Sequence, residues 1–101
     1  MSADARPGRQ CRVIAGEKLG TGSGGVANLC AEVEQALTAA VPGAPYTIDV
    51  RVISPARLSA TGTVNGRELP QQNVASSDRD LTPAAIKRFA RSIGAAARSL
   101  R

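Results

Sequence analysis

The sequence predicts an α+β two-layer sandwich with the element order β-α-β-β-β-α, in which two helices cover one face of a small, mainly antiparallel sheet. Two long stretches carry apolar residues at the helical period, and others alternate apolar and polar residues as half-buried strands do. Asn65 and Gly66, between two of these strands, indicate a tight hairpin turn. For a chain of 101 residues, we expect one domain over residues 11–101, preceded by a flexible tail over residues 1–10.

The first half of the predicted domain contains a strand, a loop and a helix. Residues 11–15 alternate as a short strand, and a glycine-rich loop follows over residues 16–25. The helical period starts at Val26, and the prolines and glycine of residues 42–45 are expected to end the helix. The apolar stripe of this helix consists of Val26, Leu29, Cys30, Val33, Leu37, Ala40 and Val41.

Three further strands are expected in the middle of the chain. Residues 46–52 alternate most clearly and leave one polar face, which favours an antiparallel sheet. Residues 57–64 form the next strand, and another begins at Arg67. Pro70 has no N–H to donate, so this last strand is expected to lie at a sheet edge or to end early. Since a helix connects the first strand to the second, the pairing of those two strands, parallel or antiparallel, stays open.

The second helix is predicted at the C-terminus. Thr82 is a suitable N-cap, and Pro83 suits the first helical position. The apolar stripe consists of Ile86, Phe89, Ala90, Ile93, Ala97 and Leu100. At 100° per residue, the opposite side carries Lys87, Arg91, Arg98 and Arg101, with Arg88 on one flank.

This last helix also carries the whole surplus of positive charge. The net charge is +5, and residues 1–81 hold as many acidic as basic side chains. The candidate partner-binding face is therefore Lys87, Arg88, Arg91, Arg98 and Arg101. It is suited to an unknown protein partner, which we favour, or to an acidic membrane surface or nucleic acid. A basic face that is merely solvated is the simpler alternative.

The two cysteines are placed to form a disulfide. Cys11 falls on the inward face of the first strand and Cys30 on the apolar stripe of the first helix, so the bond closes a loop of about 20 residues, worth about 3 kcal/mol. Two buried free thiols are the alternative. A disulfide favours a periplasmic or secreted protein. Residues 1–10 show no signal peptide, so we expect this location if the N-terminus is a processed one, and a cytoplasmic location otherwise.

The composition excludes several functional classes. Without histidine there is no Ser-His-Asp triad and no histidine metal ligand, and we expect no catalytic residue, metal or cofactor. The glycines of residues 20–25 match a dinucleotide-binding pattern, but the chain is too short for that fold. Eleven arginines against two lysines are typical of a GC-rich, bacterial source.

We therefore expect a small non-enzymatic interaction or structural module, exported and held by a disulfide. Pro70 restricts one sheet edge, which leaves the other edge open to a partner strand. The alternative is a cytoplasmic nucleic-acid-binding module that uses the basic face of the C-terminal helix.

Overall fold

The structure, a computed structural model, describes residues 9–20, 24–76 and 80–100. Its elements are β1 (Arg9–Ile14), a short 3-10 helix η1 (Gly16–Lys18), α1 (Gly25–Ala40), β2 (Tyr46–Ser54), β3 (Arg57–Val64), β4 (Arg67–Ala75) and α2 (Pro83–Arg98). The predicted α+β class and its element order are confirmed.

The first strand begins two residues earlier than the alternation indicated. Arg9 and Gln10 belong to β1, where they pair with Tyr46 and Thr47 of β2. Backbone hydrogen bonds make this pairing, and they do not require apolar side chains. The rest of the predicted tail, residues 1–8, lies outside the described part of the chain.

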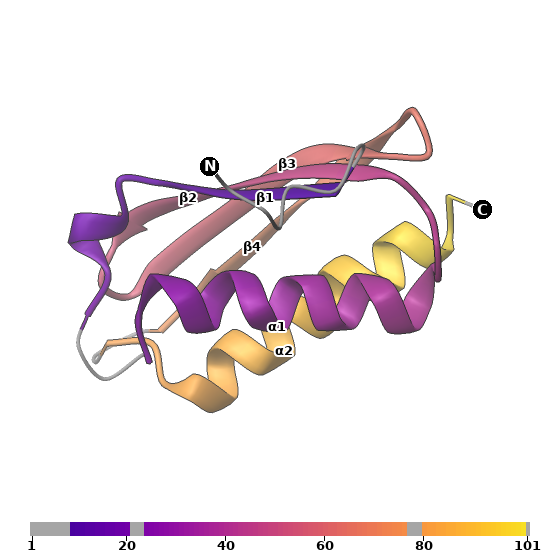
Figure 1. Cartoon of the computed structure of the whole chain (residues 1–101). Coiled ribbons are helices and arrows are strands. Elements are labelled where there is room, and N and C mark those ends of the chain that lie inside the picture. The colour runs from indigo at the N-terminus through magenta and orange to yellow at the C-terminus, as the bar shows by residue number, and fades with distance from the viewer. Residues whose placement is uncertain (1–8, 21–23, 77–79, 101) are drawn as a thin grey trace, which may run out of the picture.

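The sheet has the order β1-β2-β3-β4, and both helices lie on the same face of it (Figure 1). β1 runs parallel to β2, and the other two pairings are antiparallel. The parallel pair follows from the connection, because α1 carries the chain back along the sheet before β2 starts. The pairing of the first two strands, which the sequence left open, is thus parallel, and β1 and β4 are the two edge strands of the sheet.

The core lies between the sheet and the helix layer. Every second residue of β2 points into it, and its largest fully buried side chains include Phe89 of α2 and Leu29 of α1. The predicted stripes of both helices face this core, with one exception. Val26 is 42% exposed, because it lies in the first turn of α1 beside Gly16 and not beneath the centre of the sheet.

β4 is an edge strand, as Pro70 predicts, but it does not end early and runs on to Ala75. The proline is accommodated by a bulge, since Ala60 pairs with Gln72 whereas Gly62 pairs with Leu69. The bulged strand has one more residue than its partner there, so the missing N–H breaks no regular ladder bond.

The predicted turn and cap are both present. Asn65 and Gly66 have φ values of 54° and 75°, as a type I′ hairpin turn requires. The Thr82 side chain accepts a hydrogen bond from the Ala85 N–H at 3.2 Å, and Pro83 occupies the first turn of α2. Local sequence signals therefore place the turn of the β3–β4 hairpin and the start of α2.

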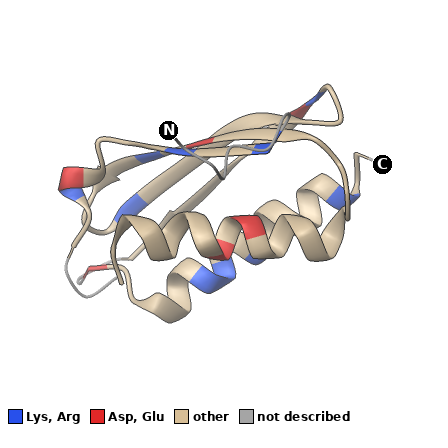
Figure 2. Cartoon of the chain, in the orientation of Figure 1, with Lys and Arg blue, Asp and Glu red and all other residues tan. Residues whose placement is uncertain are grey.

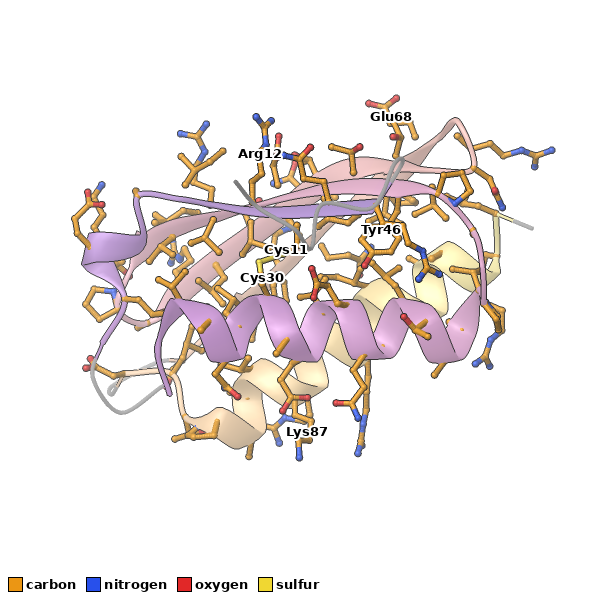
Figure 3. All side chains as sticks on the ribbon, in the orientation of Figure 1. Cys11, Arg12, Cys30, Tyr46, Glu68 and Lys87 are labelled. Atoms are coloured by element: carbon orange, nitrogen blue, oxygen red, sulfur yellow. A yellow bond between two sulfur atoms is a disulfide. The ribbon has the colours of Figure 1, made fainter. Side chains whose placement is uncertain are left out.

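Cys11 and Cys30 form a disulfide that joins β1 to α1, with their Cα atoms 5.9 Å apart (Figure 3). The bond connects the edge strand to the helix layer beneath it. The predicted pairing of the two cysteines is therefore present in the fold.

Candidate functional site

Three cations of α2 lie in one line on its exposed side. Lys87, Arg91 and Arg98 are separated by four and seven residues, so they lie within about 40° of one another around the helix axis. At 1.5 Å per residue the line is about 16 Å long. All three side chains are exposed, and Lys87 points away from the sheet (Figure 3). We call these three residues the cationic line.

Of the other two residues of the predicted basic face, the structure describes Arg88, which does not extend this line. Arg88 is exposed but lies about 100° from Lys87 around the helix. Arg101 lies outside the described residues. The structure thus describes four of the five predicted cations and brings three of them together.

Within the described part of the chain, most of this positive charge has no counterion. Lys87 Nζ lies 4.0 Å from Glu32 Oε2 of α1, where acidic and basic segments of the two helices face each other (Figure 2). Within residues 9–20, 24–76 and 80–100, no carboxylate lies within 4.0 Å of the guanidinium groups of Arg91 and Arg98. Their positive potential is therefore available to a partner.

A shallow groove runs along the cationic line, between α1 and α2. Two hollows of about 310 and 260 Å³ make it up, and both are lined by Ala36, Ala39 and Arg91, so they are continuous. We call it the helix-layer groove. Its lining is Glu32, Gln35, Ala36, Ala39 and Ala40 of α1 with Lys87, Ala90, Arg91, Gly94, Ala95 and Arg98 of α2.

The floor of the groove is made of small residues because the helices approach closely there. A Cβ added to Gly94 would lie 3.1 Å from the carbonyl oxygen of Ala36, closer than ordinary van der Waals contact. Alanines continue this floor at Ala39, Ala90 and Ala95. The groove therefore offers an apolar base of small side chains, with guanidinium and ammonium groups along its α2 rim.

The opposite face of the sheet has a different charge pattern. Arg12 of β1 donates two hydrogen bonds to the Asp49 carboxylate of β2, at 2.8 and 3.0 Å. These bonds and, to a smaller extent, the negative charge of Asp49 raise the pKa of Arg12 above its ordinary value, so this arginine stays charged. Cation and anion neutralise each other there, whereas Arg51, the next outward-facing residue of β2, is exposed and has no ion pair among the described residues.

The groove is lined by charged and small apolar side chains that can bind a partner. In the described parts of the chain, no three His, Cys, Asp or Glu side chains come together as metal ligands. Cys11 and Cys30 are joined and hold no free thiol. Across those same residues, no helix is both long and apolar enough to cross a membrane.

Sequence reasoning found the cations but missed the α1 side of the site. Glu32 and Gln35 are recognisable from the helical period only as residues that face away from the core. The available signal was the run of small residues flanking each apolar stripe, such as Ala36 and Ala39 on α1 and Gly94 on α2.

No protein-family model, curated protein or solved structure matches this chain. The interpretation of the groove therefore rests on its own geometry and charge.

Proposed function

We propose that this chain is a small non-enzymatic interaction module that binds an acidic segment of a protein partner in the helix-layer groove. The observation that carries the proposal is the cationic line beside an alanine floor, with Arg91 and Arg98 unpaired among the described residues. An acidic partner with small apolar side chains would match both the charge and the floor.

The apolar floor favours a protein over a nucleic acid. An exposed ion pair contributes only about 0.2–1 kcal/mol, so three such pairs alone bind weakly. Burial of apolar surface, at about 25 cal/mol per Å², adds to this only for a partner with apolar side chains. A phosphate backbone would use the cations and leave the floor empty, and the two aromatic residues of the chain, Tyr46 and Phe89, are both buried.

The Cys11–Cys30 disulfide supports an oxidising compartment, and we propose that the module acts in the periplasm or outside the cell. The test is the redox state of the two cysteines in the native host. Cells are quenched in acid and alkylated without reductant, and the intact mass is measured. An unalkylated, oxidised chain supports export, and two alkyl adducts contradict it.

The groove is tested with three anionic probes over a range of salt concentrations. These are an acidic peptide, a duplex DNA and vesicles that contain phosphatidylglycerol. The variant Arg91→Glu/Arg98→Glu reverses the charge of two cations in the groove. Its matched control, Arg57→Glu/Arg67→Glu, makes the same change of net charge at exposed positions of β3 and β4.

We expect the acidic peptide to bind, with loss of affinity in the groove variant and little change in the control. Equal losses in both variants would mean that net charge alone attracts the peptide, which contradicts a site. Tighter binding of duplex DNA, with a steep salt dependence that the groove variant reduces, would instead support the nucleic-acid alternative.

A further inference from the structure

We infer that the segment bound in the helix-layer groove is an amphipathic α-helix whose carboxylates repeat at i, i+4 and i+11, so that in the complex a third helix lies over the contact between α1 and α2. This inference rests on the proposed function and specifies the partner further. Its support is the spacing of the cationic line and the composition of the groove floor.

The spacing of the cations matches a helix. From Lys87 to Arg91 the rise along α2 is about 6 Å, and from Arg91 to Arg98 it is about 10.5 Å. A second helix lying alongside α2 has the same rise per residue. Its side chains at i, i+4 and i+11 lie on one face, so all three can meet the cations together.

The same spacing does not match an extended chain. At about 3.3 Å per residue, a strand reaches Arg91 after about two residues and Arg98 after about three more. Successive side chains of a strand point to opposite sides, so after five residues the third carboxylate points away from the groove. An extended acidic peptide can therefore meet only two of the three cations at once.

The floor also suits a helix. Helix axes pack about 8–10 Å apart, and small side chains at the contact allow the lower part of that range. Ala36, Ala39, Ala90 and Ala95 leave room for the side chains of a third helix over the contact between α1 and α2. The cationic line is about 16 Å long, which corresponds to about three helical turns.

The two ends of the groove differ in charge. Glu32 faces Lys87 at 4.0 Å and offsets part of its charge, whereas Arg98, at the other end, has no carboxylate among the described residues within that distance. The carboxylates that matter most are therefore those opposite Arg91 and Arg98, and neutralisation of Lys87 is expected to have the smaller effect.

The test compares two peptides of identical composition, each of about 16 residues, which is roughly 24 Å of helix. One carries glutamates at i, i+4 and i+11 beside a stripe of alanine and leucine, and the other carries them at i, i+2 and i+5. Binding to the oxidised protein is measured by calorimetry at low salt. We expect the first peptide to bind at least about tenfold tighter, since it alone meets all three cations and the floor.

A substitution in the floor separates shape from charge. Ala39 is exposed and lines both hollows, so Ala39→Trp places a bulky ring in the groove and leaves the net charge unchanged. Ala27→Trp is the matched control, an exposed alanine of α1 that lines neither hollow. We expect the first substitution to weaken the helical peptide about tenfold or more and the second to leave its affinity unchanged. Circular dichroism and thermal melting check that both variants fold.

The failure of this inference is distinguishable from failure of the proposed function. If both peptides bind equally and are weakened equally by Ala39→Trp and by Arg91→Glu/Arg98→Glu, the acidic partner in the groove stands and the helical partner is refuted. If neither peptide binds the unsubstituted protein at low salt, both proposals are refuted.

Discussion

Removal of the Cys11–Cys30 disulfide is expected to lower the free energy of unfolding by about 3 kcal/mol. The two cysteines are 19 residues apart, so the bond closes a loop of 20 residues. In the chain-entropy model, such a loop removes about 11 cal/mol/K from the unfolded state, which is about 3.3 kcal/mol at 25 °C. For a chain of 101 residues this corresponds to about 15 °C in melting temperature.

The assay is urea unfolding followed by far-ultraviolet circular dichroism, because the chain has no tryptophan and one tyrosine. Oxidised and reduced forms of the same chain are compared first, so that no side chain changes. The Cys11→Ala/Cys30→Ala variant then serves as a permanently open form. At about 1–3 kcal/mol per M of urea, the midpoint is expected to fall by about 1–3 M.

Hydrogen exchange shows where the stability is lost. β1 is held by β2 on one side and by α1 beneath it, so its amides are expected to lose more protection on reduction than those of β3. A stability difference below about 1 kcal/mol would refute the entropic reasoning, since a 20-residue loop cannot give so small a term in that model. A uniform loss of protection across the sheet would refute the local role of the bond in β1.

Three substitutions test other parts of the fold by urea unfolding. Gly94→Val is expected to lower the free energy of unfolding by about 1–3 kcal/mol, because the valine side chain would press on the Ala36 carbonyl. An unchanged urea midpoint would mean that α1 and α2 can move apart without loss of stability. Thr82→Ala is expected to lower the free energy of unfolding by about 1 kcal/mol, because it removes the hydrogen bond that the Thr82 side chain accepts from the Ala85 N–H. Thr82→Ser should keep most of this stability, and equal losses in the two variants would contradict a capping role. Phe89→Ala, in the core at 2% exposure, is expected to lose about 3–5 kcal/mol, and a loss below 1 kcal/mol would mean that the core closes around the gap.

Local features of the fold were predictable because the responsible residues are neighbours in the sequence. The turn at Asn65 and Gly66, the cap at Thr82 and the edge position enforced by Pro70 each depend on a few adjacent residues. The start of β1 was not predictable in this way. Arg9 enters the strand because β2 offers backbone partners, which the alternation of side chains does not report.

The candidate site was predictable only in part, for a related reason. The line of Lys87, Arg91 and Arg98 follows from the helical period alone. The groove beside it depends on how closely α1 and α2 approach, and that distance is set where Gly94 meets Ala36, across more than fifty residues of chain. The period of one helix gives no information about the position of another.

The position of Cys11 in an edge strand has a consequence for the order of folding. β2, β3 and β4 are consecutive strands joined by short turns, whereas β1 pairs with β2 across the whole of α1, as Cys11 with Ile48. Pairings that close short loops form sooner than pairings that close long ones, so β1 is expected to dock onto a meander already in place. Cys11 then comes close to Cys30 late, so the disulfide forms after the rest of the fold has assembled. In such a chain, a catalyst of disulfide formation would stabilise the folded protein and would not determine its folding pathway.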